Sequence, residues 1–411
     1  MHHRLYLTPG MFGFGRLATY DYFAHVARAL RERFAHAGAT LETHVVDVAP
    51  TASIRRRAAR LAELVASTTE TERAKGEGGP IHLFGHSTGG LDARLVASPS
   101  ARLPIDGERL AWLPRLRSIS TMSTPHYGTP LASFFATVSG QRMLYAVSAL
   151  TFIALSLGAP PLAAASALVV ALGRLDRALG MEIAVLDRTT EALLRALEPA
   201  SSREVREYLD AITKDQGAVI QLTPEAMDLF QAGIEDRPGI VYQCACAMAP
   251  PPSARKLARD LLSPWRAVSS ALFATLYGIT SRTDDRYPCA PDDAKARRAL
   301  EQAFGSVVSL RANDGVVPTT SQVWGTIVWA GAADHLDVLG HYSSAARPAR
   351  TSLWSRWVGP RRPQPRVQEA ESHVDWLTSG AGFDDAAFAR LMDALANGML
   401  AAARDACTTA V

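Results

Sequence analysis

Short apolar segments that are typical of buried strands alternate with amphipathic helical segments over the first 125 residues. Apolar residues form continuous runs in the strand-like segments and recur every three or four positions in the helical segments. The continuous runs predict strands at Leu5–Thr8, Leu41–Val48, Ile81–Phe84 and Leu116–Met122. This alternation predicts an α/β fold with a mostly parallel central sheet and helices on both faces.

Two of the helical segments show how such helices would pack. The first carries its apolar residues on one face and ends at Gly38, and these residues are Phe23, Val26, Leu30 and Phe34. The second places most of its arginines away from its apolar face. We expect these arginines to form a solvated helix face rather than a membrane-docking patch. They are Arg55, Arg56, Arg57 and Arg60.

The alternation stops at a segment of unusual composition, because residues 143–173 contain no charged side chain. Pro160 and Pro161 divide this segment into pieces shorter than the roughly 20 residues of a membrane-spanning helix, so two short apolar helices are predicted. Strand patterns return at Ile240–Ala245 and Thr326–Ala330. We therefore predict a core formed by residues 1–130 and 237–411, with residues 131–236 inserted as a helical lid.

Charge and cysteine content exclude several classes of protein. The chain has 43 Lys and Arg against 40 Asp and Glu, which gives no basic surplus for binding nucleic acid. Its four cysteines have no CxxC spacing, so reduced thiols are expected rather than a disulfide framework or structural zinc. No signal peptide is visible, so a cytoplasmic location is expected as written; a secreted protein numbered after signal removal would look the same.

The sharpest local motif lies directly after the Ile81–Phe84 strand and directly before a helix, and it reads GHSTGG from Gly85 to Gly90. Small residues two positions on either side of Ser87 allow a sharp turn that projects the hydroxyl from the top of the sheet. A serine hydroxyl needs a base, and the base needs an orienting carboxylate. The motif thus predicts Ser87 as a nucleophile.

The partners of this serine are expected downstream, at the ends of later strands. Asp314 lies in a polar turn, and His335 follows the Thr326–Ala330 strand, which gives the chain order serine, aspartate, histidine. We predict Asp314 as the acid and His335 as the base, with His373 as the rival base. His86, inside the serine turn, is expected to pack or hydrogen-bond locally.

An oxyanion formed during acyl transfer needs two backbone N–H donors. Thr88 follows the serine and supplies one donor. The second is expected in the glycine-rich loop after the first strand, where Met11 is the candidate.

Several short motifs together resemble the bacterial true lipases of the Pseudomonas and Burkholderia type, within the α/β-hydrolase fold. The motifs are PGMFGF after the first strand, GHSTGGLDAR around Ser87, STPHYGTPLA from Ser123, NDGVV at Asp314 and DHLD at His335. The resemblance implies the same roles for Ser87, Asp314, His335, Met11 and Thr88, and it implies a mobile helical lid after the TPH segment. Pro9 and Thr88 differ from the histidine and glutamine usual in the family.

The resemblance also implies a structural calcium ion near the base, for which Asp337 matches one ligand position. The predicted reaction itself needs no cofactor. The sequence therefore predicts a serine carboxylic-ester hydrolase that acts on apolar or long-acyl esters, with transient lipid-interface contact through its lid. The alternatives are a short-chain esterase, polyester hydrolase or thioesterase with the same residues, and a membrane-associated acyltransferase or lipid-binding protein.

Overall fold

A computed structural model describes residues 1–11, 16–17, 20–74, 78–137, 140–148, 191, 195, 199–342 and 377–408. Its centre is a six-stranded sheet with strand order β4-β1-β5-β6-β7-β8, and all neighbouring strands are parallel. The strands are β1 (His2–Thr8), β4 (Thr40–Val45), β5 (Ile81–His86), β6 (Leu116–Met122), β7 (Val241–Met248) and β8 (Thr326–Ala332). The predicted parallel sheet is confirmed. A small antiparallel ribbon, β2 (Arg16–Leu17) with β3 (Tyr20–Asp21), follows β1.

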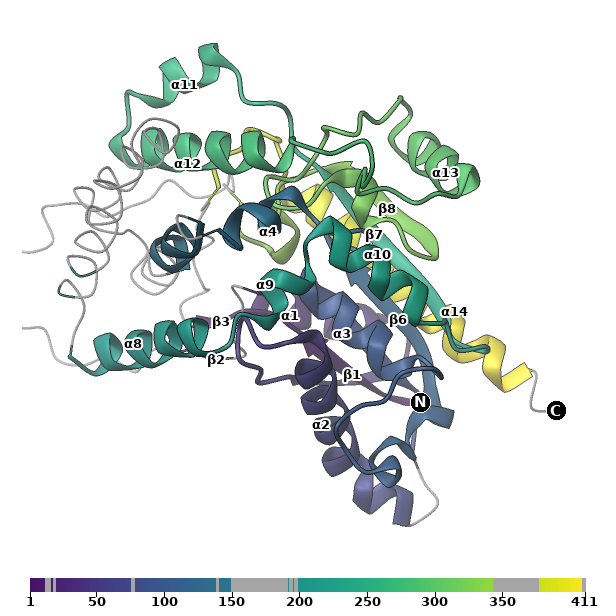
Figure 1. Ribbon diagram of the computed structural model, residues 1–411. Coiled ribbons are helices and arrows are strands. Elements are labelled where there is room, and N and C mark those ends of the chain that lie inside the picture. Colours follow the sequence, from purple (N-terminus) through teal and green to yellow (C-terminus); the bar gives the residue numbers. More distant parts are fainter. Residues whose placement is uncertain are drawn as a thin grey trace, which may run out of the picture.

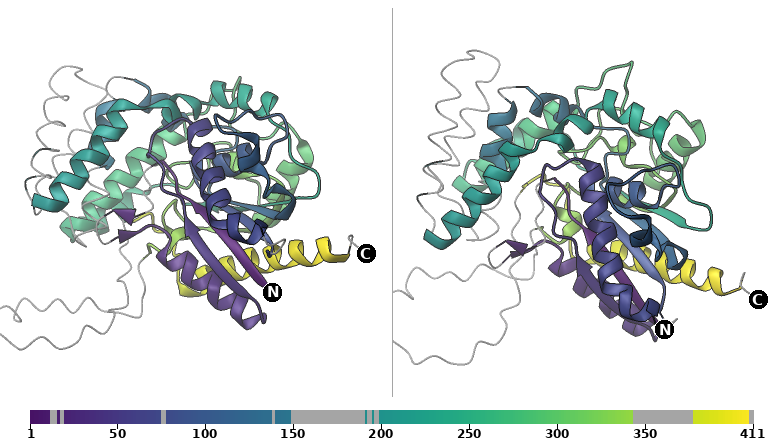
Figure 2. Two further views of the ribbon diagram at one scale, coloured as in Figure 1. Left: turned by 90° about the horizontal axis from the view of Figure 1, so that it is seen from below. Right: turned by 60° about the horizontal axis from the view of Figure 1, so that its bottom comes forward.

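Helices cover both faces of this sheet (Figures 1 and 2). One face carries α1 (Ala24–His36) and α14 (Asp385–Thr408), and the other carries α2 (Ile54–Ala74) and α3 (Thr88–Ala97). Successive residues of a strand point to opposite faces, so Leu5 and Leu7 of β1 pack on the α1 side while Tyr6 packs on the α2 side. The predicted two-sided cover is thereby confirmed.

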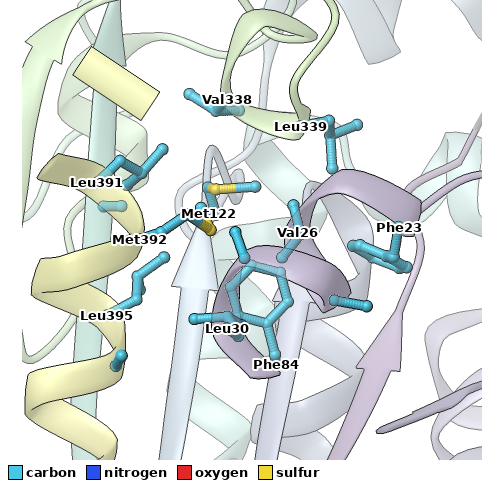
Figure 3. Close-up of a cluster of buried hydrophobic side chains, with 14 of the residues drawn as sticks. Phe23, Val26, Leu30, Phe84, Met122, Val338, Leu339, Leu391, Met392 and Leu395 are labelled. Atoms are coloured by element: carbon cyan, nitrogen blue, oxygen red, sulfur yellow. The ribbon is translucent and has the colours of Figure 1, made fainter. Parts of the chain in front are cut away.

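The core on the α1 side joins the two ends of the chain (Figure 3). Phe23, Val26 and Leu30 recur at helical spacing and pack against Phe84 and Met122 of the central strands. From α14 come three further side chains: Leu391, Met392 and Leu395. The chain leaves α1 through Gly38, whose φ of 71° is a conformation that glycine adopts without strain.

A smaller core contains cysteines, beneath α13 (Ala294–Phe304) and β8. Cys244 and Cys246 point to the same side of β7, with their Sγ atoms 3.9 Å apart. These two residues and Cys289 are free thiols, as predicted, whereas the side chain of Cys407 lies outside the described residues.

A helical layer lies over the carboxyl edge of the sheet. Helices within or at the boundary of the predicted lid include α4 (Pro130–Phe135), α8 (Pro199–Lys214), α9 (Gly217–Gln221) and α10 (Pro224–Gly233), and residues 140–148 are helical as well. They share one apolar cluster with α12 (Pro264–Thr280), which comes after β7 and the short helix α11 (Ala254–Asp260). The layer therefore uses chain on both sides of β7, and the lid boundaries 131–236 stay a prediction.

Most of the apolar segment that suggested a lid, residues 149–173, lies outside the described part of the chain. Among the helices that the structure describes, none combines the length and apolar character needed to cross a bilayer.

A pair of buried histidines links β1 to β5 and predicts sensitivity to acid. His3 Nδ1 lies 3.0 Å from His82 Nε2, and His82 Nδ1 lies 2.7 Å from Ser118 Oγ. Burial, followed by the charge of His3, lowers the pKa of His82 to about 3. Below the ordinary value of 6.5 the unfolded chain therefore binds more protons than the folded chain, so stability falls as the pH falls.

We expect His82 alone to remove about 2 kcal/mol from the free energy of unfolding between pH 7 and pH 5. Urea denaturation at both pH values measures this loss. The variant His82→Gln should lose correspondingly less on acidification, whereas replacing the exposed His36 with glutamine should leave the loss unchanged. Equal losses in the His82→Gln variant and the unmodified protein would contradict the prediction.

Candidate active site

Ser87 occupies a strained turn between β5 and α3. Its backbone has φ 54° and ψ −130°, a combination that residues with a side chain rarely adopt. The turn is held by a hydrogen bond from Ser87 N–H to the carbonyl oxygen of Met122, at 2.9 Å. Strain of this kind persists where the surrounding structure enforces it, and it often marks a functional residue.

The flanking glycines explain how this turn is tolerated. A Cβ atom on Gly85 would lie 2.1 Å from the backbone nitrogen of Gly90, and one on Gly89 would lie 2.0 Å from the carbonyl oxygen of Thr8. Neither position can therefore hold a side chain. The close approach of strand, turn and helix is the physical reason for the glycine spacing around Ser87.

Two candidate oxyanion donors come from neighbouring segments. Thr88 is the first residue of α3, so its N–H is among those that have no partner within the helix. Met11 is buried in the loop after β1, next to Gly10. A Cβ atom on Gly10 would lie only 2.7 Å from Ser87 Cβ, so this loop packs directly against the serine.

Arg57 holds the same loop, so the predicted solvated arginine face is wrong at this one position, whereas Arg55, Arg56 and Arg60 are exposed as predicted. Its side chain is fully buried, and its guanidinium donates to the carbonyl oxygens of Pro9, Ala49 and Pro50. Its Nε donates to Asp92 Oδ2 at 2.9 Å. Burial raises the pKa of Asp92 to about 7, and the charge of Arg57 opposes this rise. The arginine at this position therefore fixes the loop rather than facing solvent.

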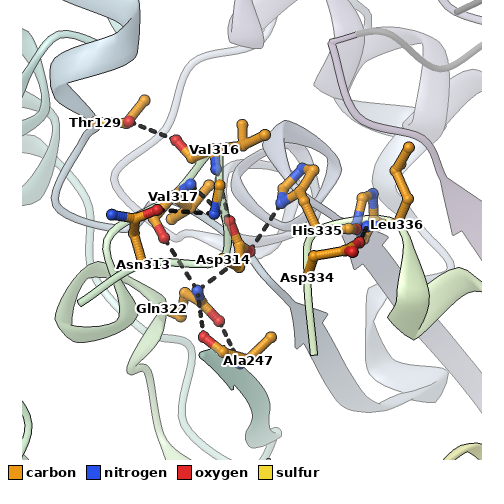
Figure 4. A network of polar contacts seen from close by, with 12 residues as sticks. Thr129, Ala247, Asn313, Asp314, Val316, Val317, Gln322, Asp334, His335 and Leu336 are labelled. Atoms are coloured by element: carbon orange, nitrogen blue, oxygen red, sulfur yellow. Dashed lines mark hydrogen bonds and ion pairs between the residues drawn. The ribbon is translucent and has the colours of Figure 1, made fainter. Parts of the chain in front are cut away.

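Asp314 and His335 are brought together across the carboxyl edge of the sheet (Figure 4). His335 Nδ1 lies 2.9 Å from Asp314 Oδ2, and His335 N–H donates to the carbonyl oxygen of Asp314 at 2.9 Å. The side chain of His335 is 5% exposed and that of Asp314 is 0% exposed, so water screens this pair poorly. A carboxylate at this position fixes the imidazole with its proton on Nδ1 and leaves Nε2 able to accept a proton.

A residue that the sequence reasoning missed completes the surroundings of Asp314. Gln322 Nε2 donates to Asp314 Oδ2 at 3.2 Å, while Gln322 Oε1 accepts from Ala247 N–H at 2.7 Å (Figure 4). Asp314 Oδ1 accepts from the N–H groups of Val316 and Val317 at 2.9 and 2.8 Å. Each oxygen of the carboxylate thus accepts two hydrogen bonds, which fix its orientation beside His335.

His335 also lies beside the residue that precedes the serine. The ring centroids of His335 and His86 are 4.6 Å apart, and His86 Nε2 lies 3.0 Å from the carbonyl oxygen of His335. His86 packs and hydrogen-bonds as expected, but the expectation that it does so locally is wrong, because its ring contacts a turn 249 positions later in the chain. The rival base His373 lies outside the described residues.

The implied calcium ligand takes part in the turn around His335. Asp337 Oδ2 accepts from the N–H of Asp334 at 2.9 Å. Within the described ranges, no group of three or more His, Cys, Asp or Glu side chains that could hold a metal ion is present. Calcium, which takes six to eight oxygen ligands, therefore stays a prediction.

The arrangement has the parts that define an α/β-hydrolase fold. A serine sits on a strand-to-helix elbow in the centre of a parallel sheet, and an aspartate and a histidine follow in that order on later turns. Such a site can deliver a serine oxygen to a carbonyl carbon.

Comparison with protein-family models and with curated proteins found no match. Among solved structures, EstA from Clostridium botulinum is similar, with 19% identity, 83% of each chain covered and a TM-score of 0.46. Lipase 1 from Pelosinus fermentans matches at 15% identity over 82% of this chain and 93% of its own, with a TM-score of 0.47. A metagenomic carboxyl esterase matches at 15% identity over 97% of this chain and 75% of its own, with a TM-score of 0.45.

Proposed function

We propose that the protein is a serine carboxylic-ester hydrolase. The strained backbone of Ser87 carries this proposal, because an elbow with φ 54° directs the hydroxyl to the sheet edge at which a buried histidine and aspartate are already hydrogen-bonded. Two of the similar solved structures are a carboxyl esterase and a lipase, which agrees with the proposal.

In the proposed reaction, Ser87 Oγ attacks the ester carbonyl carbon while its proton passes to Nε2 of His335. The N–H groups of Met11 and Thr88 stabilise the oxyanion, and His335 returns the proton to the leaving alcohol. A water molecule then gives its proton to His335 and attacks the acyl-enzyme, which releases the acid and restores Ser87. Asp314 stabilises the imidazolium in both steps.

Apolar or long-acyl esters are the proposed substrates. The apolar cluster of the helical layer includes Met11 of the oxyanion loop, and Leu336, next to the base, packs against it. An acyl chain leaving the reacting carbon in that direction would meet apolar side chains. Membership of the Pseudomonas and Burkholderia lipase type and lipid contact through the lid belong to the same proposal. A short-chain esterase, polyester hydrolase or thioesterase, or an acyltransferase, would use the same residues.

The experiment is covalent labelling with a fluorophosphonate, followed by mass spectrometry and a series of p-nitrophenyl esters. We expect the label on Ser87 and kcat/KM that rises from the acetate to the octanoate ester. A label absent from Ser87 would contradict the hydrolase proposal. A fall in kcat/KM with acyl length would instead retain the mechanism and favour a short-chain esterase. Transfer of the acyl group to an added alcohol in preference to water would favour the acyltransferase.

A further inference from the structure

His86, the last residue of β5, is buried and lies directly before Ser87, yet it transfers no proton in the proposed reaction. Its two ring nitrogens contact two different segments of the site. Nδ1 lies 2.7 Å from the hydroxyl of Tyr22, and Nε2 lies 3.0 Å from the carbonyl oxygen of His335. Both partners are themselves buried.

The direction of these hydrogen bonds follows from the chemistry of the groups. A carbonyl oxygen only accepts, so Nε2 of His86 carries a proton and donates to His335. Burial, and then the neighbouring His335, hold the pKa of His86 well below 6.5, so the ring is neutral and its Nδ1 has no proton. The Tyr22 hydroxyl must therefore donate to Nδ1.

The tyrosine extends the chain of hydrogen bonds to the oxyanion loop. Its oxygen accepts the backbone N–H of Gly10 and is buried, and burial raises the pKa of the hydroxyl, so the hydroxyl keeps its proton. Gly10 directly precedes Met11 and lies so close to Ser87 that a side chain at this position would collide with the serine. One directed chain thus runs from Gly10 through Tyr22 and His86 to His335.

We propose that Tyr22 and His86 form a positioning relay that holds the oxyanion loop and the base in register around Ser87, a role that rests on the proposed function. The relay joins two groups that must act on one carbonyl at the same moment, since the oxyanion donors and His335 approach the reacting atoms from different loops. A displacement of either loop by a fraction of an ångström lowers the rate, because catalytic geometry tolerates little error.

The test compares Tyr22→Phe with Tyr6→Phe. Tyr6 is also buried, and Tyr6→Phe loses a hydroxyl contact, 2.7 Å to Thr68 Oγ1, but Tyr6 lies away from the site. With a p-nitrophenyl butyrate substrate, we expect Tyr22→Phe to lower kcat about tenfold with KM within about twofold, the pattern of a lost transition-state interaction. Tyr6→Phe should keep the unmodified kcat, and both variants should melt at similar temperatures.

A double-mutant cycle shows whether the two residues act as one unit. His86→Asn keeps an acceptor near the Tyr22 hydroxyl but loses the donor to His335, so its kcat should also fall about tenfold. The double variant Tyr22→Phe/His86→Asn should fall about tenfold in total rather than a hundredfold, because either change already interrupts the relay. If Tyr22→Phe does not fold, His86→Asn is compared with His82→Asn, which changes another buried histidine away from the site.

Three results would overturn the relay: equal kcat in Tyr22→Phe and Tyr6→Phe, a hundredfold loss in the double variant, or a change confined to KM and melting temperature. These failures are distinct from failure of the proposed function. Fluorophosphonate labelling of Ser87 in the unmodified protein supports the hydrolase whatever the relay variants do. Absence of that label removes both.

Discussion

We expect replacement of Ser87 with alanine to lower kcat for p-nitrophenyl esters by about 10⁶-fold, the order expected when a serine nucleophile is removed. The remaining groups still bind and polarise the ester, but no oxygen is placed to attack it. Stopped-time product assays on concentrated enzyme measure this loss. Ser309→Ala, an exposed serine in another loop, should keep full activity. Hydrolysis retained in Ser87→Ala would mean that another group attacks the ester.

The backbone strain at Ser87 also predicts a difference in stability between two variants at this position. Alanine keeps the strain of φ 54°, whereas glycine relieves it. Ser87→Gly should therefore have a free energy of unfolding about 1 kcal/mol higher than Ser87→Ala, after allowance for the greater freedom of glycine in the unfolded chain. Urea denaturation of the two inactive variants makes the comparison. Equal stability would show that the turn is not strained in solution.

Replacing Asp314 with asparagine should lower kcat by about 10⁴-fold, although the side chain changes by only one group. The amide oxygen can still accept from the N–H groups of Val316 and Val317. The NH₂ group then faces Nδ1 of His335. His335 must then move its proton to Nε2, the nitrogen that has to accept the proton of Ser87. The pH profile of kcat and the rate of fluorophosphonate labelling measure the loss.

The Asp314→Asn substitution also places two hydrogen-bond donors, the new NH₂ group and Gln322 Nε2, next to each other. Gln322 Nε2 points to Asp314 Oδ2, and Gln322 cannot turn its amide over without losing the bond that its Oε1 accepts from Ala247 N–H. We expect a stability cost of about 1 to 3 kcal/mol from the unsatisfied buried donors. Asp293→Asn is the matched control, because this residue caps α13 at Lys295 N–H and asparagine caps equally well. An Asp314→Asn variant with unreduced kcat would remove Asp314 from the mechanism.

The fold and the pair Asp314–His335 could be predicted because each depends on a repeating or local pattern. Runs of apolar residues predicted the central strands, and glycine spacing predicted the elbow at Ser87. His335 was predicted from its place after the last strand, and Asp314 from its place in a polar turn ahead of that strand. Their roles stay predictions, whereas their contact is a feature of the structure.

Three supporting residues could not be predicted in the same way. Helical periodicity places Arg57 with its charged neighbours, and nothing local shows that this one guanidinium meets the buried Asp92 and the carbonyl oxygen of Pro9. Gln322 is the last residue of a four-residue 3-10 helix, Thr319–Gln322, which is too short to show a periodic pattern. His86 contacts a residue brought beside it only by the packed sheet. Such contacts depend on tertiary structure, which a single sequence does not reveal.

The packing of α14 has a consequence for synthesis of the chain. Leu391 and Leu395 cover an apolar face formed by residues near the opposite end, including Leu5, Leu7 and Phe23. While a ribosome is still making residues 385–408, that face has no cover, and a nascent chain emerges slowly compared with the collapse of its apolar parts. Translation should therefore pass through an aggregation-prone intermediate, which is a substrate for chaperones until α14 packs on this face.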